Sequence, residues 1–142
     1  MKFQARPVLF ALALGTALPA AAAVMSASAL PQPKTENGIT YLSGGIGKSE
    51  AQAMRAEAKR YPLSMTFSTR KDNEFLASVP VTIRNSSGKT VLDAVSEGPI
   101  LLVKLPPGKY KVTAEAYGKT YRRSVQVSAK GDTPLYFHWP RV

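Results

Sequence analysis

The chain has 142 residues, with 19 Lys and Arg against 9 Asp and Glu, a single histidine and no cysteine. This length indicates one small domain, and the lack of cysteine excludes disulfides and a lipid-modified N-terminal cysteine. One histidine does not provide the clustered ligands of a zinc hydrolase. The net charge of +10 favours contact with polyanions, and the more common alternative is that such a charge serves solubility alone.

The first 29 residues have the three parts of a secretory signal peptide. Lys2 and Arg6 precede the apolar run 8–18, which is shorter than the roughly 20 residues needed to span a membrane. Small residues follow, and the A-x-A rule allows cleavage after residue 23 or 29. We therefore expect a signal peptide over 1–29, no transmembrane anchor after cleavage, and a periplasmic or secreted protein. Without the two basic residues of this segment, 17 basic and 9 acidic residues remain, a net charge of +8.

A flexible leader and loop are expected over residues 30–48. The stretch begins with prolines and polar residues, and only residues 39–42 (ITYL) have the composition of a short strand. Its glycine-rich end resembles a phosphate-binding P-loop, but that motif requires glycine at the position occupied by Leu42. We therefore expect no nucleotide site in this loop.

A short helix is predicted over residues 49–61. Ser49 and Gln52 have the spacing of a capping box, and apolar residues recur after them at helical spacing. Pro62 ends the helix because proline disrupts a helix interior.

From residue 62 to residue 142 the pattern is that of strands. Apolar and polar residues alternate in short segments, and turn signals recur about every 8 to 12 residues. This pattern predicts an all-β domain, an antiparallel sandwich of about seven strands preceded by one short helix.

One hairpin allows a prediction of register. A two-residue turn at Gly118–Lys119 places Glu115 opposite Arg122, as an exposed cross-strand charge pair. The same register places Arg123 on the apolar face of its strand, beside Val125. An arginine there is the most unusual charge in the chain.

The run 105–114 (LPPGKYKVTA), with Gly118 after it, resembles the carboxypeptidase regulatory-like domain. Residues 79–83 and the turn at Gly88 agree with that family in their order. The resemblance covers roughly residues 62–139 and implies a transthyretin-like or immunoglobulin-like sandwich, in a free-standing exported bacterial form. Domains of that family are mostly accessory modules without catalytic residues of their own.

The sequence provides no pattern for catalysis. A Ser-His-Asp triad would have to use His138, and no serine lies in an elbow motif. The hydroxyisourate hydrolases, which are enzymes with a transthyretin-like fold, use more than one histidine and end in Tyr-Arg-Gly-Ser, whereas this chain ends in WPRV. We therefore expect no enzyme activity, no cofactor and no metal site.

Basic and aromatic residues near the predicted hairpin form a candidate binding surface. Such side chains hold anionic groups or glycans through stacking and charge-assisted hydrogen bonds. The alternative is that these side chains have no binding role: the lysines lie on the outer face in contact with solvent, and the tyrosines are half-buried, as in many β-sandwiches. The candidates are Lys109, Lys111, Tyr117, Tyr121, Arg122 and Arg123.

The functional hypothesis is a non-catalytic exported module of the cell envelope. Its expected partner is an envelope protein, an acidic glycan or an anionic lipid, and no specific nucleic acid is expected. The alternative hypothesis is a purely structural or stress-related periplasmic protein, and a hydrolase is the least favoured class.

Overall fold

The computed structural model describes residues 30–69 and 74–140. The signal peptide and the cleavage sites expected within residues 1–29 lie outside these ranges. Among the described residues, no helix is both long enough and apolar enough to cross a membrane.

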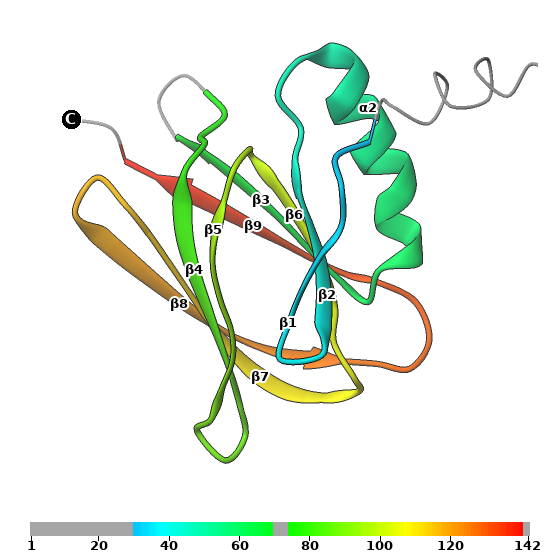
Figure 1. Cartoon of the computed structure of the whole chain (residues 1–142). Coiled ribbons are helices and arrows are strands. Elements are labelled where there is room, and N and C mark those ends of the chain that lie inside the picture. The colour runs from blue at the N-terminus through cyan, green and yellow to red at the C-terminus, as the bar shows by residue number, and fades with distance from the viewer. Residues whose placement is uncertain (1–29, 70–73, 141–142) are drawn as a thin grey trace, which may run out of the picture.

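The described residues form two β-sheets and one short α-helix (Figure 1). The five-stranded sheet has the order β1 (Lys34–Glu36), β2 (Ile39–Gly44), β6 (Ile100–Lys104), β3 (Leu63–Thr69), β9 (Thr133–Trp139). The four-stranded sheet has the order β5 (Thr90–Ser96), β4 (Val79–Asn85), β7 (Gly108–Ala116), β8 (Lys119–Val127). The helix α2 (Lys48–Glu57) continues into the 3-10 turn Ala58–Arg60.

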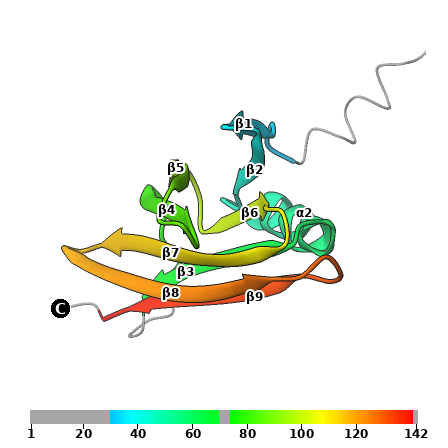
Figure 2. The same ribbon diagram turned by 90° about the horizontal axis from the view of Figure 1, so that it is seen from below.

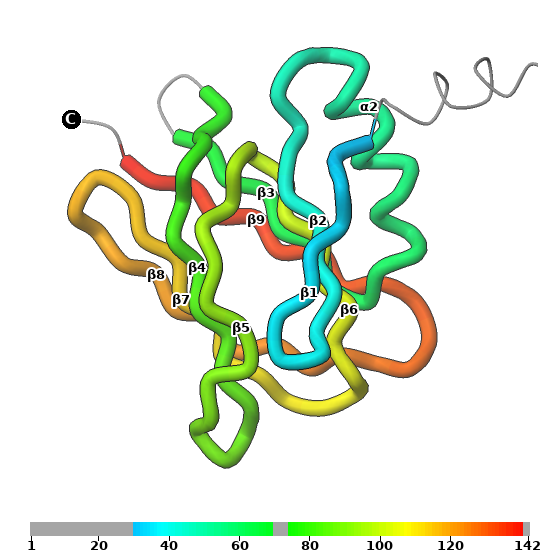
Figure 3. The backbone as a smooth tube through the Cα atoms, in the orientation of Figure 1, coloured from blue at the N-terminus to red at the C-terminus, as the bar shows by residue number. Residues whose placement is uncertain are grey.

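The predicted all-β sandwich with one short helix is confirmed, with two differences in detail. From residue 62 onward the described residues contain the predicted seven strands, β3 to β9. The differences are that two further strands, β1 and β2, precede the helix, and that β3 pairs with β9 in parallel rather than antiparallel. The loop after β8 carries the chain from the four-stranded sheet to the other sheet, where Thr133 N–H donates to Pro62 O at 2.8 Å. The last strand therefore starts at the same end of the sheet as β3 (Figure 3).

The stretch 30–48, expected as a flexible leader and loop, contains the strands β1 and β2. Asn37 and Gly38 join them with φ angles of 53° and 76°, the positive values that a type I′ hairpin turn requires. The Asn-Gly pair was a hairpin signal in the sequence. The main core buries Ile39 and Tyr41 of β2, which anchors this hairpin to the sandwich.

The start of the helix differs from the predicted capping box. The helix begins at Lys48, after the N-cap Gly47, and no side chain caps it there. Instead, Glu50 Oε1 accepts hydrogen bonds from the backbone N–H groups of Gly45 at 2.7 Å and Ile46 at 3.1 Å. An acidic residue in the first turn also complements the positive end of the helix dipole.

Two hydrophobic clusters hold the fold together. Between the sheets, Phe67, Phe137 and Trp139 are fully buried, with ring centroids 5.6 to 6.1 Å apart. The second cluster lies between α2 and the five-stranded sheet, where Met54 of the helix packs on the outer face of β2 and β6. Because β6 is covered on both faces, all four residues of its run Ile100–Val103 are buried.

The β7–β8 hairpin turns one residue earlier than predicted. Its turn is Tyr117–Gly118, and Arg122 lies opposite Thr113 rather than opposite Glu115. The predicted charge pair is therefore wrong. The turn was misplaced because its first residue, Tyr117, has a φ of 52°, a conformation that a tyrosine rarely adopts. The correction shifts the register by two residues, so each residue stays on its predicted face.

Candidate functional site

The outer face of the four-stranded sheet brings four basic side chains together. The register places Arg84 of β4 beside Lys111 of β7, Lys109 two residues before Lys111, and Arg122 on the neighbouring strand β8. All four side chains are exposed and alternate with core residues along their strands. We call Arg84, Lys109, Lys111 and Arg122 the basic face.

The charges of the basic face are not neutralised within the described part of the chain. The ion pairs found there are Lys34 with Glu97 and Arg60 with Glu57, all outside the basic face. Arg84 Nη1 donates to the carbonyl of Gly88 at 3.2 Å, a neutral acceptor. Acidic residues do occur on the same side of the sheet, on the edge strand β5 (Asp93) and near the β7–β8 turn (Glu115), but neither forms an ion pair with the four basic side chains.

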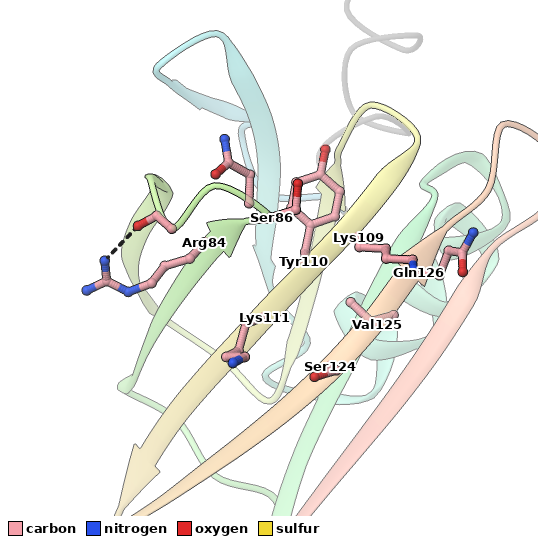
Figure 4. Close-up of a pocket in the computed structure, with 10 residues that line it drawn as sticks. Arg84, Ser86, Lys109, Tyr110, Lys111, Ser124, Val125 and Gln126 are labelled. Carbon is pink, nitrogen blue, oxygen red and sulfur yellow. Dashed lines mark hydrogen bonds between the residues drawn. The ribbon is translucent and has the colours of Figure 1, made fainter.

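An open groove of about 560 Å³ lies at one end of the basic face, beside the turn between β4 and β5. Arg84, Lys109 and Lys111 line it together with the polar side chains of Ser124 and Gln126 (Figure 4). Its volume lies within the range of about 300 to 1,000 Å³ that is common for small-ligand sites. The groove therefore has room for one or two anionic groups of a larger ligand.

Hydrogen bonds fix the walls of this groove. Asn85 Oδ1 accepts from the backbone N–H groups of Ser87 at 3.1 Å and Lys89 at 3.0 Å, which holds the β4–β5 turn. On the other side, the Tyr110 hydroxyl donates to Pro106 O at 2.7 Å, and burial raises the pKa of this phenol. A wall with a fixed shape reduces the entropy lost on binding.

The structure places the six predicted surface residues at three locations. Lys109, Lys111 and Arg122 lie on the basic face. The exposed Tyr117 occupies the hairpin turn, whereas Tyr121 and Arg123 project from the opposite face of β8. The fourth member of the basic face, Arg84, was missed in the sequence, where it lies far from the hairpin.

Arg123 lies at the edge where the two sheets meet. Its Nη1 donates to the carbonyl of Tyr136 on β9 at 3.2 Å, and its guanidinium carbon lies 5.0 Å from the centroid of the Phe137 ring. The distance and position fit a cation–π contact. The unusual arginine on the apolar face therefore connects β8 with β9, and it does not belong to the basic face.

Trp139 makes a second link across the same edge. Its Nε1–H donates to the carbonyl of Lys119 on β8 at 2.9 Å, and its ring lies 5.4 Å from that of Tyr121, measured between centroids. Figure 2 shows β8 and β9 side by side along this edge. Two side chains thus hold together edge strands that belong to different sheets.

The side chains that commonly bind metals do not form a cluster within the described residues. Within residues 30–69 and 74–140, no group of three or more His, Cys, Asp or Glu has the arrangement of a metal site. The histidine His138 has Ser68 as its hydrogen-bonding neighbour, with 2.8 Å between Nδ1 and Oγ.

Residues 63–135 match the family model of the Rhizobiales growth-associated tandem repeat domain. The chain belongs to this family. The matched segment begins with β3 and ends within β9, so β1, β2 and α2 precede it. The basic face lies wholly inside the family domain. No curated protein matches this sequence.

Several solved structures are similar to parts of the chain. The major pilin subunit of Bacillus cereus aligns with a TM-score of 0.44 and 13% identity, over 54% of this chain and 28% of the pilin. The 5-hydroxyisourate hydrolase of Klebsiella pneumoniae aligns with a TM-score of 0.43 and 16% identity, over 54% of this chain and 88% of the hydrolase. The Bacillus anthracis TIE protein aligns with a TM-score of 0.41 and 20% identity, over 56% of this chain and 16% of that protein. The chain spans less than a third of the pilin and of the TIE protein, and the similarity concerns the fold alone.

Proposed function

We propose that this chain is a non-catalytic β-sandwich module of the cell envelope that binds an acidic glycan through its basic face. The observation that supports the proposal is the placement of Arg84, Lys109, Lys111 and Arg122 on adjacent strands, beside a groove and without an ion pair among the described residues. The exported location rests on the signal-peptide pattern of residues 1–29.

The spacing of the charges explains why an anion would bind there. Neighbouring strands lie about 4.8 Å apart, and residues two apart on a strand lie about 7 Å apart. Like charges on such neighbouring positions repel each other, by roughly 0.6 to 0.9 kcal/mol per pair in water when the charges themselves are about 5 to 7 Å apart. An anion at the groove relieves this repulsion and accepts charge-assisted hydrogen bonds from the arginine and the lysines.

An acidic glycan fits this face better than a lipid surface does. Binding to a membrane interface uses large apolar side chains beside the basic ones, and the large exposed hydrophobic residues of the described chain are Ile46, Phe75, Val95, Tyr117 and Tyr136. None of these five lines the groove of the basic face. A carboxylate- or phosphate-bearing sugar polymer requires only the charges and the polar side chains that are present.

The alternative hypothesis of a purely structural or stress-related envelope protein has less support. Such a protein would use a free sheet edge to add a partner strand. Here Glu36 Oε2 accepts from the backbone N–H of Asp93 on the edge strand β5 at 2.9 Å, and Arg123 donates to a carbonyl of the edge strand β9. Side chains of this chain therefore already occupy one backbone group on each of the edge strands β5 and β9.

Two family relationships bear on the proposal in different ways. Membership of a growth-associated repeat family is consistent with a role at the growing envelope, which we include in the proposal. The resemblance to the carboxypeptidase regulatory-like domain supports a non-catalytic accessory role, and this closer kinship remains a prediction.

Binding to acidic polysaccharides, lipopolysaccharide and anionic vesicles, measured at about 0.01 M and about 0.15 M salt, tests the proposal. We expect the Lys109→Gln, Lys111→Gln variant to bind acidic glycan at least about tenfold more weakly at low salt, a loss of about 1.4 kcal/mol. The matched control is Lys48→Gln, Lys59→Gln, which removes two exposed positive charges from the helical segment. Equal losses in both variants would show that only net charge matters, and binding to vesicles alone would replace the glycan by a lipid.

A further inference from the structure

The outer face of the five-stranded sheet is only partly covered by the helix. Figure 1 shows α2 beside β2 and β6, on the side of the molecule away from β8. The outer faces of β3 and β9 remain open, and a groove of about 490 Å³ lies there, with Arg55 of α2 at its rim. This groove is on the other sheet from the basic face.

The floor of this groove contains uncharged hydroxyl and ring side chains, beside the apolar residues Ala58, Ile100 and Pro134. The parallel register places Thr66 beside Tyr136 and Ser68 beside His138, and Ser64 precedes them on β3. These positions alternate with the core residues of both strands, so their side chains share the outer face. We call Ser64, Thr66, Ser68, Tyr136 and His138 the hydroxyl groove.

One hydrogen bond fixes the polar end of the hydroxyl groove. Ser68 Oγ lies 2.8 Å from His138 Nδ1, and the serine is only 2% exposed. The imidazole is exposed, and no hydrogen bond from its Nε2 to another described residue is found. A ring held through one nitrogen thus offers the other nitrogen to a ligand as a donor or an acceptor.

Two large aromatic side chains are exposed at the same groove. Tyr136 is 55% exposed and Phe75 is 51% exposed, and both line it. Exposed aromatic rings beside oriented polar groups are typical of ligand sites, because the rings provide apolar contact area and the polar groups fix the ligand's orientation. The charged lining residues, Arg55 and Asp132, lie on the helix and in a loop rather than on the floor.

We propose that the hydroxyl groove is a second binding site, which takes an uncharged sugar of a glycan. A pyranose ring has an apolar face that stacks on Tyr136 or Phe75 and hydroxyl groups that exchange hydrogen bonds with Thr66 and His138. The uncharged floor gives no preference for an anion, in contrast to the basic face. A peptide strand would need a free edge of β9, and β3 and Arg123 already bond to that strand.

This inference goes beyond the proposed function and does not depend on it. The two sites lie on different sheets and differ in chemistry, so they predict opposite responses to salt. Binding at the basic face weakens as salt rises, whereas stacking and neutral hydrogen bonds in the hydroxyl groove change little. A failure of one proposal therefore leaves the other one standing.

The test is amide NMR of the purified protein during titration with neutral oligosaccharides, cellohexaose and chitohexaose, up to about 10 mM, a range suited to weak sites. We expect chemical shift changes at residues of β3 and β9, among them Thr66 and His138, and we expect them to persist at about 0.15 M salt. Tyr136→Ala should weaken this binding at least about tenfold, with the fold retained because the tyrosine is exposed.

Tyr117→Ala is the matched control, since this tyrosine is equally exposed, at 57%, but lies in the β7–β8 turn. Its binding should stay within about twofold of that of the original protein. The proposal is overturned if neither sugar shifts the groove residues, if both tyrosine variants lose binding equally, or if an extended peptide produces the shifts and the sugars do not.

Discussion

Replacing Arg123 by alanine tests whether this arginine holds the two sheets together. The variant loses a hydrogen bond from a charged donor to the Tyr136 carbonyl, and such bonds contribute roughly 1.5 to 3 kcal/mol. It also loses the cation–π contact with Phe137, about 0.5 to 1 kcal/mol at an exposed site. Because Arg123 is exposed and water replaces part of the lost bond, we expect a net loss of about 1 to 2 kcal/mol.

The assay is urea unfolding at neutral pH, followed by the fluorescence of Trp139, which lies against the same edge. A loss of this size corresponds to a decrease of roughly 5 to 10 °C in the melting temperature of a domain of about 100 residues. Arg123→Lys should recover only part of it, because a lysine keeps the charge but lacks the planar guanidinium.

The matched control is Arg122→Ala, one residue away on the opposite face of β8. Its side chain makes no ion pair with another described residue, so we expect a change within about 0.5 kcal/mol. Glycan binding should respond in the reverse order, weakened by Arg122→Ala and unaffected by Arg123→Ala. Equal stability of the two variants would refute the role of Arg123 at the sheet edge.

Two further predictions concern packing and pH. A Cβ at Gly98 would lie 2.8 Å from Gly44 Cα and closer still to the carbonyl oxygen of Gly44. Gly98→Ala should therefore lower the free energy of unfolding by at least about 1 to 3 kcal/mol. An unchanged urea midpoint would contradict the close approach of these two backbones. Burial raises the pKa of the phenols of Tyr61 and Tyr110, so the folded state holds their protons more tightly than the unfolded chain does. The free energy of unfolding should therefore fall as the pH rises above about 10. Urea midpoints measured between neutral pH and about pH 11 check this, and a midpoint that stays level would count against the burial of the two tyrosines, Tyr61 and Tyr110.

The local features of the fold, namely the faces of the strands and the position of the helix, could be predicted from the sequence alone. Alternation of apolar and polar residues assigns each residue of a strand to one face, because the side-chain period of a strand is two. For this reason Arg123 was placed on the apolar face correctly, even though the turn at Tyr117 was misplaced by one residue. The helix was likewise found from its apolar spacing, although Glu50 rather than a Ser49 cap orders its first turn.

The neighbours of each strand were decided only by the tertiary structure. A pattern of period two contains no information about which strands pair, because many pairings bury the same apolar faces. The parallel pairing of β3 with β9 brings Ser68 to His138, 70 residues apart in the chain, and the pairing of β4 with β7 brings Arg84 to Lys111.

The candidate sites, like the fold, have one part that the sequence predicts and one part that only the tertiary structure shows. Lys109, Lys111 and Arg122 were found from the sequence, since they occupy outward positions of a single hairpin and a hairpin is a local structure. Arg84 and the whole hydroxyl groove were not found, since they depend on contacts between distant segments. Those contacts form because the apolar faces of both sheets pack against each other, and packing selects one arrangement among many with the same local pattern.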